Sequence, residues 1–176
     1  MNDNRNIYLL GFMGTGKTKI GRILAQRLSW PFLDTDEQIQ QEAGLSIPEI
    51  FKLKGEKGFR QLEKACIIEI SQRKRTVISL GGGAVIDPEN WELISKSGIT
   101  ITLSYPPEII FSRINKKTDR PLLDENRYGE KYERIKILLK TRESFYQRAD
   151  LILHMNSEVS AKHIAEAILG FLRGMP

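Results

Sequence analysis

The chain has 176 residues, of which 40% are hydrophobic and 28% charged, a composition typical of a globular protein rather than of a fibrous or disordered one. Lysine and arginine number 27 against 22 aspartates and glutamates, and the net charge of +5 favours an anionic partner without identifying it. The basic runs are short and not interleaved with aromatic residues, and no apolar run approaches the ~18 residues that span a bilayer. We therefore expect neither a nucleic-acid-binding protein nor a membrane protein.

Short apolar runs of β type alternate with longer segments of helical period, which predicts repeated βαβ units and an α/β fold. The predicted strands are Ile7–Leu10, Pro31–Leu33, Thr76–Leu80, Ile99–Leu103 and Leu151–Leu153. The predicted helices lie near 16–28, 36–43, 46–54, 59–73, 88–97, 107–115, 128–148 and 158–173. No linker or repeat divides the chain, so we predict a single domain over residues 1–176.

The first six residues lack the apolar segment of a secretory signal, and a single cysteine, Cys66, excludes an intramolecular disulfide. We therefore expect a cytoplasmic protein. Cys66 lies in a helical pattern with Leu62, Ala65 and Ile70, which favours a buried core thiol over a reactive one.

The segment 116–126 is polar, charged and interrupted by Pro121, so it fits neither a helix nor a strand. Loops of this length inside compact domains are usually lids or binding segments, and otherwise disordered connectors. We predict a mobile lid, with a connector as the alternative.

Residues 11–18, directly after the first predicted strand, satisfy the phosphate-binding pattern G-x-x-x-x-G-K-[ST]. Glycines let backbone N–H groups surround phosphate oxygens, and the N-terminus of the following helix adds partial positive charge. Lys17 is expected to reach the β and γ phosphates of a nucleotide, and Thr18 to offer its hydroxyl to Mg²⁺. The residues predicted to contact the nucleotide phosphates or their metal are Gly14, Thr15, Gly16, Lys17 and Thr18.

Two carboxylates, Asp34 and Asp36, follow the second predicted strand. Residues i and i+2 of an extended chain point to the same side, so both side chains are expected to face the phosphate site at the carboxyl ends of the strands. One of them would serve Mg²⁺ and the other a hydroxyl substrate. The alternative is that Asp36 only caps the next helix.

From about residue 7 to about residue 170, an ordered set of segments resembles the shikimate kinase family. The phosphate loop and Asp34-Thr35-Asp36 resemble the family's opening, and residues 55–63 resemble its G-E-x-x-F-R-x-x-E segment. Gly81-Gly82-Gly83 resembles the triple glycine, Arg120-Pro121-Leu122-Leu123 the lid, and residues 142–149 the R-x-x-x-Y-x-x-x-A stretch. The resemblance implies a P-loop kinase fold, a five-stranded parallel sheet flanked by helices, with a lid over about 116–126 and a substrate-binding helical segment over about 36–63.

The resemblance also implies a reaction: transfer of the γ-phosphoryl group of ATP to the 3-hydroxyl of shikimate, with Mg²⁺ as cofactor, on the pathway to chorismate and the aromatic amino acids. Arg60 and Arg142 match the family's carboxylate-binding arginines, and planar guanidinium groups suit bidentate capture of a carboxylate. Glu63 follows Arg60 by three helical residues and is expected to orient it. Asp36 would contact the substrate hydroxyls, and Asp34 would hold Mg²⁺ through water.

Three further assignments come from the same resemblance. Gly81, Gly82 and Gly83 are expected to let the backbone approach the substrate ring and to offer N–H donors, the alternative being a plain strand-to-loop turn. Arg120 matches the lid arginine that neutralises charge on the transferring phosphate, so the predicted catalytic residues are Lys17, Asp36 and Arg120. Arg113 matches a position that stacks on adenine.

Two other functions remain open on the sequence: a small-molecule kinase of the same fold acting on gluconate or a nucleoside monophosphate, and a non-catalytic nucleotide-binding regulator. Arg60, Arg142 and the triple glycine favour a compact carboxylate over a nucleobase. The presence of Lys17, Asp36 and Arg120 favours an active enzyme. We expect a monomer whose ligands are the small molecules ATP and shikimate.

Overall fold

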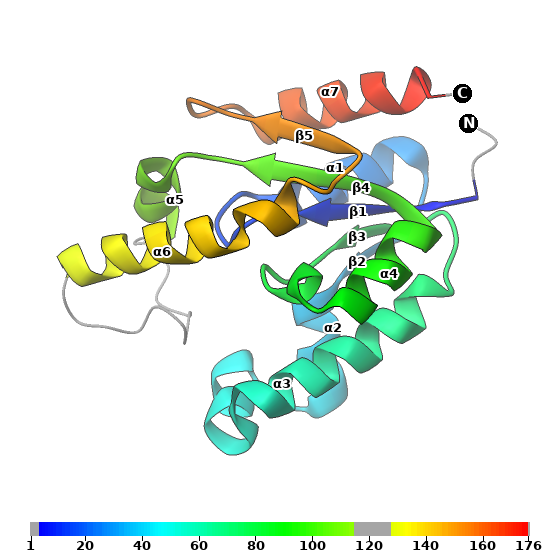
Figure 1. Ribbon diagram of the computed structural model, residues 1–176. Helices are drawn as coiled ribbons and strands as arrows, with labels where there is room; N and C mark the ends of the chain where they lie inside the picture. Colours follow the sequence, from blue (N-terminus) through cyan, green and yellow to red (C-terminus); the bar gives the residue numbers. More distant parts are fainter. Residues whose placement is uncertain (1–3, 115–127, 176) are drawn as a thin grey trace.

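The computed structural model describes residues 4–114 and 128–175 and has a five-stranded sheet at its centre (Figure 1). The strands lie in the order β2-β3-β1-β4-β5, and each hydrogen-bonded pair is parallel. Their bounds are β1 Asn6–Leu10, β2 Phe32–Asp34, β3 Val77–Ser79, β4 Gly98–Ser104 and β5 Leu151–His154. The predicted α/β class and all five predicted strands are confirmed, with ends shifted by at most one residue.

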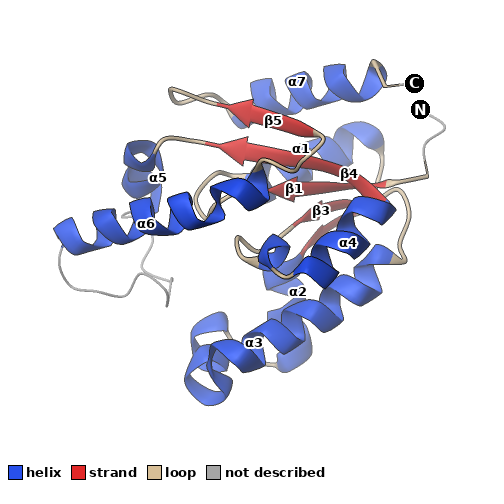
Figure 2. Cartoon of the chain, in the orientation of Figure 1, coloured by secondary structure: helices blue, strands red, loops and turns tan. Residues whose placement is uncertain are grey.

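Helices cover both faces of the sheet, with α1 and α7 packed together on one face and α4 and α6 on the other (Figure 2). This burial explains the apolar strands, since a parallel sheet covered on both faces has no solvent-facing side. Ile7, Leu9, Ile78 and Ile101, for example, are completely buried. The helices are α1 Lys17–Leu28, α2 Thr35–Ala43, α3 Ile47–Ser71, α4 Pro88–Ser97, α5 Pro107–Ile114, α6 Tyr128–Tyr146 and α7 Ala161–Arg173, with a 3₁₀ turn η1 at Ala84–Ile86.

The two helices predicted at 46–54 and 59–73 form the single element α3, with a break at Gly55. Gly55 has φ 67° and ψ −178°, a conformation that an L-residue with a side chain rarely adopts, so the chain changes direction there. A capping box between Ser46 and Glu49 fixes the first turn. The last helix begins at Ala161 rather than near 158, because the side chain of Ser160 caps it.

Cys66 lies on the second part of α3 and is 1% exposed. Burial, reinforced by nearby carboxylates, raises the pKa of its thiol to about 12. The thiol is therefore protonated and unreactive at neutral pH, which confirms the prediction of a core residue.

The extended geometry expected for Asp34 and Asp36 is wrong, although both residues line a cavity at the carboxyl ends of the strands, as expected. The strand ends at Asp34, whose side chain caps α2 by accepting hydrogen bonds from the backbone N–H of Asp36 at 3.0 Å and of Glu37 at 3.4 Å. Asp36 lies inside the first helical turn, so the i, i+2 rule for extended chain does not apply to the pair. The alternative that Asp36 is the cap is also wrong, since Asp34 has that role.

Because all five strands are parallel, their carboxyl ends meet at one edge of the sheet. The phosphate loop follows β1, Asp34 ends β2, Gly81–Gly83 follow β3 and Tyr105 follows β4. The predicted lid at 116–126, with Arg120, lies outside the described residues. No helix within the described ranges is long and apolar enough to cross a bilayer.

Candidate active site

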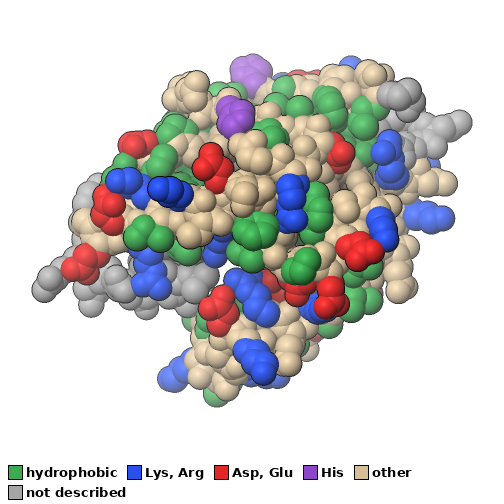
Figure 3. Space-filling model, viewed as in Figure 1, with side chains coloured by type: hydrophobic (Ala, Val, Ile, Leu, Met, Phe, Trp, Pro, Cys, Tyr) green, Lys and Arg blue, Asp and Glu red, His purple; other side chains and the backbone are tan. Residues whose placement is uncertain are grey.

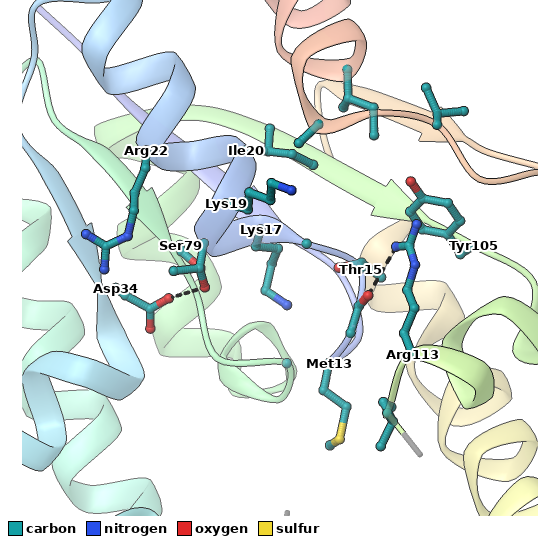
Figure 4. Close-up of a pocket in the computed structure, with 18 of the residues that line it drawn as sticks. Met13, Thr15, Lys17, Lys19, Ile20, Arg22, Asp34, Ser79, Tyr105 and Arg113 are labelled. Carbon is teal, nitrogen blue, oxygen red and sulfur yellow. Dashed lines mark hydrogen bonds between the residues drawn. The ribbon is translucent and has the colours of Figure 1, made fainter. Parts of the chain in front are cut away.

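A cavity of about 840 Å³ opens at the carboxyl edge of the sheet (Figure 4). Its walls come from segments far apart in the sequence, namely the phosphate loop, the start of α1, the β2–α2 junction, the end of β3, α5 and the start of α7. The predicted site residues that line it are Gly14, Thr15, Gly16, Lys17, Thr18, Asp34, Asp36, Gly82 and Arg113.

The phosphate loop is held in its curved shape by its own side chains. Gly14 and Gly16 adopt positive φ angles of 82° and 91°, and Gly16 directly precedes the first helical residue, Lys17. The Thr15 hydroxyl donates to the carbonyl oxygen of Phe12 at 2.8 Å. The Lys17 ammonium donates to the carbonyl oxygens of Gly11 at 2.7 Å and Phe12 at 3.0 Å, so it is fixed inside the loop.

Thr18 and Asp34 provide an oxygen-rich pair where a metal ion is predicted. The Thr18 hydroxyl donates to Asp34 Oδ2 at 2.7 Å, while Asp34 Oδ1 caps α2, so both carboxylate oxygens are oriented. Within residues 4–114 and 128–175 no group of three or more His, Cys, Asp and Glu side chains could hold a metal. This donor set fits Mg²⁺, which takes one or two protein oxygens and completes its shell with water and substrate phosphates.

Arg60 and Glu63 form an ion pair on α3 next to this cavity. Arg60 Nη1 donates to Glu63 Oε2 at 2.7 Å, and Nη2 reaches Glu56 at 3.3 Å, so the expected pairing is present. Glu63 is 2% exposed, and burial raises the pKa of its carboxyl despite the opposing charge of Arg60. Its second oxygen, Oε1, is buried without a hydrogen-bond partner in the described part of the chain and lies 3.0 Å from the position that a Cβ of Gly81 would occupy.

Two of the three glycines after β3, Gly81 and Gly83, leave space for side chains of the site rather than providing an unusual backbone conformation, whereas a Cβ at Gly82 would make only ordinary contacts. A Cβ at Gly81 would lie 2.8 Å from Asp36 Oδ1 and 3.0 Å from Glu63 Oε1, and a Cβ at Gly83 would lie 2.6 Å from Arg60 Nη1. The side chains of the site therefore pack directly on the glycine backbone. The N–H of Gly81 donates to the Thr35 hydroxyl at 2.9 Å, so that group is already engaged and the expectation that it serves a substrate is corrected.

Arg142 reaches the same glycines from α6 on the other side. It is 5% exposed, and its Nη1 donates to the carbonyl oxygen of Gly82 at 3.2 Å. The Tyr146 hydroxyl donates to the same oxygen at 2.6 Å, and burial raises the pKa of that phenol to about 12, so it remains a donor. The guanidinium groups of Arg60 and Arg142 thus flank Gly82 and Gly83.

Arg113 connects the phosphate loop to the far wall of the cavity (Figure 4). Its guanidinium lies over the Tyr105 ring with Cζ 4.0 Å from the ring centre, donates to the carbonyl oxygen of Gly14 at 3.2 Å and pairs with Glu158. The hydrogen bond to Glu158 raises the pKa of Arg113, which keeps it charged. The guanidinium plane is thereby held beside the loop.

Sequence reasoning assigned no role to Tyr146, Thr35 or Glu158. Tyr146 had a usable signal, because it follows Arg142 by four helical residues and therefore shares its face. Thr35 and Glu158 had none, since each depends on a contact between distant segments.

Comparison with known proteins identifies relatives over nearly the whole chain. The family model described as shikimate kinase matches residues 13–173. A shikimate kinase of Geobacter metallireducens is 42% identical over 170 residues, covering 97% of this chain and 93% of the relative. One of Synechococcus sp. is 44% identical over 169 residues, covering 96% of this chain and 82% of the relative.

Two solved structures that are similar to this chain belong to the same family. Shikimate kinase from Acinetobacter baumannii in complex with shikimate superposes with a TM-score of 0.91 at 36% identity, covering 97% of this chain and 93% of that one. The enzyme from Bacteroides thetaiotaomicron has a TM-score of 0.88 at 31% identity, covering 96% and 98%.

Proposed function

Since this chain belongs to the shikimate kinase family and is an ATP-dependent kinase of shikimate, we propose how its residues transfer the γ-phosphoryl group to the 3-hydroxyl. The observation that supports the assignment best is the placement of two guanidinium groups, Arg60 and Arg142, on either side of Gly82 and Gly83 beside the Asp36 carboxylate. Cations at one end and an acceptor at the other suit a small carboxylate that carries hydroxyls.

The phosphate end of the site comprises residues 14–18. Backbone N–H groups of Gly14, Thr15 and Gly16 hold the nucleotide phosphates at the N-terminus of α1. Lys17 turns from the loop carbonyls toward the β and γ phosphates. Thr18 and Asp34 would hold Mg²⁺, Asp34 through water, and the bound ion would supply positive charge to the phosphate oxygens.

At the acceptor end, Arg60 and Arg142 bind the substrate carboxylate, and Asp36 hydrogen-bonds the attacking hydroxyl. The backbone of Gly81, Gly82 and Gly83 forms the surface against which the substrate ring lies. Phosphoryl transfer passes through a loose transition state, so orientation of the hydroxyl by Asp36 contributes more than early removal of its proton.

Arg113 supports the adenine ring. Tyr105 covers one face of its guanidinium, and the base stacks on the other. Arg120 lies outside the described residues, and its proposed role as the lid arginine rests on the family resemblance alone.

The remaining proposals concern the state of the protein. We assign residues 1–176 to one domain that acts as a cytoplasmic monomer on small molecules, without nucleic-acid or membrane partners. Acidic and basic side chains are interspersed on the face drawn in Figure 3, and no broad surface of one sign is visible there. Such a mixed surface is unlike the basic face of nucleic-acid-binding proteins.

A coupled assay of ADP release tests the assignment. Shikimate, gluconate and a nucleoside monophosphate are offered separately with ATP and Mg²⁺. We expect turnover with shikimate only, and equal turnover with gluconate or with a nucleotide would refute the acceptor assignment.

A further inference from the structure

Thr35 lies between the two carboxylates of the site but does not face the cavity. It is the first residue of α2, is completely buried, and is not among the residues that line the cavity. Its hydroxyl accepts a hydrogen bond from the N–H of Gly81 at 2.9 Å and donates to the carbonyl oxygen of Ser79 at 3.3 Å. Both hydrogen-bonding directions of the hydroxyl are therefore used.

These two hydrogen bonds connect the ends of β2 and β3 just beyond their last paired residues. Asp34 and Ser79 are the last register partners of the two strands, and the chain leaves the extended conformation at Thr35. If β2 were longer, its backbone would pair with this part of the chain after β3. The Thr35 hydroxyl makes these hydrogen bonds instead. As a result, the first glycine of the triplet is held against the start of α2 at a fixed spacing.

That spacing determines where the acidic groups of the site lie. Asp36 Oδ1 lies 2.8 Å, and Glu63 Oε1 3.0 Å, from the Cβ position of Gly81, so both carboxylates rest against this glycine. Glu63 in turn orients Arg60 through the 2.7 Å ion pair. A displacement of Gly81 by a few tenths of an ångström therefore changes the position of the hydroxyl acceptor and of one carboxylate-binding arginine together.

We propose that Thr35 is a positioning residue for shikimate: its hydroxyl sets the distance between Gly81 and Asp36, and thereby the shape of the acceptor pocket. The inference rests on the proposed function of that pocket. Thr35 itself does not contact the substrate. It acts through Gly81, whose N–H would otherwise be left without an acceptor in a partly buried place.

The test uses Thr35→Val, which keeps the shape of the side chain and removes the hydroxyl, and Thr35→Ser, which keeps the hydroxyl. Loss of one buried hydrogen-bond partner predicts roughly a fivefold to tenfold rise in the KM for shikimate in Thr35→Val. The KM for ATP should stay within about twofold, since the phosphate loop makes none of these contacts. Thr35→Ser should restore most of the shikimate KM.

Thr100→Val is the matched control. The Thr100 hydroxyl is also buried and also bonds in both directions, accepting from the N–H of Asp150 at 3.0 Å and donating to its carboxylate at 2.7 Å. We expect Thr100→Val to lose about as much thermal stability as Thr35→Val does. Its KM for shikimate should be unchanged, because Asp150 lies outside the site.

Three results would overturn the positioning role: a wild-type shikimate KM in Thr35→Val, an equal rise in both KM values, or a Thr35→Ser variant as impaired as Thr35→Val. If Thr35→Val does not fold, Thr35→Cys replaces it, and its weaker hydrogen bonding predicts an intermediate KM. Absence of shikimate phosphorylation by the wild-type chain would contradict the proposed function instead, so the two failures are distinguishable.

Discussion

Replacement of Arg60 by alanine should lower stability as well as substrate binding, because it leaves Glu63 as a buried carboxylate without its partner. Glu63 is 2% exposed and its pair with Arg60 is 2.7 Å long. Removing one partner of a buried ion pair costs about 3–5 kcal/mol. The Arg60 side chain is 29% exposed, so solvent reduces the cost of losing the pair. We therefore expect Arg60→Ala to lower the free energy of unfolding by about 2–3 kcal/mol. For a chain of this size that is a fall in Tm of roughly 4–12 °C.

Thermal unfolding of four proteins measures the effect: the wild type, Arg60→Ala, the double variant Arg60→Ala/Glu63→Gln, and the control Arg73→Ala. Arg73 pairs with Glu69 at 2.9 Å, but both side chains are about half exposed, so its loss should cost under about 1 kcal/mol. The double variant should recover most of the lost Tm without recovering shikimate affinity. An Arg60→Ala protein as stable as the control, or a double variant with no recovery, would refute the reasoning.

The same pair predicts a pH dependence. Burial holds the pKa of Glu63 above its ordinary value of 4.5, so the folded state binds this proton more readily than the unfolded state does. The resulting stability is complete below pH 4.5 and is lost as the pH rises through the folded pKa. Without Arg60 that pKa rises further, so the deficit of Arg60→Ala should be small near pH 4 and should grow toward pH 8. A deficit independent of pH would contradict this account.

Three further predictions concern the reacting groups. Lys17→Met should abolish turnover while circular dichroism stays unchanged; normal activity would contradict the phosphate-loop assignment. Asp36→Asn should lower kcat more than Asp34→Asn at saturating Mg²⁺, and higher Mg²⁺ should partly rescue only Asp34→Asn, in which asparagine still caps α2; rescue of Asp36→Asn instead would reverse the two roles. Arg142→Ala should raise the KM for shikimate roughly tenfold to hundredfold with little change for ATP, whereas equal losses would indicate a role in the fold.

The sequence predicted structure correctly where the pattern was strong and local. The five strands, the phosphate loop and the Arg60–Glu63 pair each depend on residues close together in the chain, so spacing alone places them. The error at Asp34 has a local cause of a different kind. A strand can end in a helix cap without any loop, and the direction of the next side chain then follows the helix.

The role of the triple glycine could not be obtained from the sequence, because it depends on what lies against it. The sequence suggested that the glycines lack side chains in order to leave space for the substrate. In the structure, the side chains of Asp36, Glu63 and Arg60 also pack against them. Those contacts bring α2 and α3 against the end of β3. The hydrogen bond that Thr35 accepts from Gly81 and the one that Tyr146 donates to Gly82 likewise join segments 46 and 64 residues apart.

The strand order also has a consequence for synthesis of the protein on the ribosome. β1 is the central strand, yet its neighbours are β3 and β4, and the end of β4 at Ser104 is made roughly 90 residues after Leu10. At about 5–20 residues per second this interval is roughly 5–20 s. Throughout it, the apolar strand Asn6–Leu10, which is entirely buried in the finished fold, lacks at least one of its two partners. The nascent chain therefore exposes this apolar strand early and covers it late, which makes the strand a natural ligand for chaperones that act during translation.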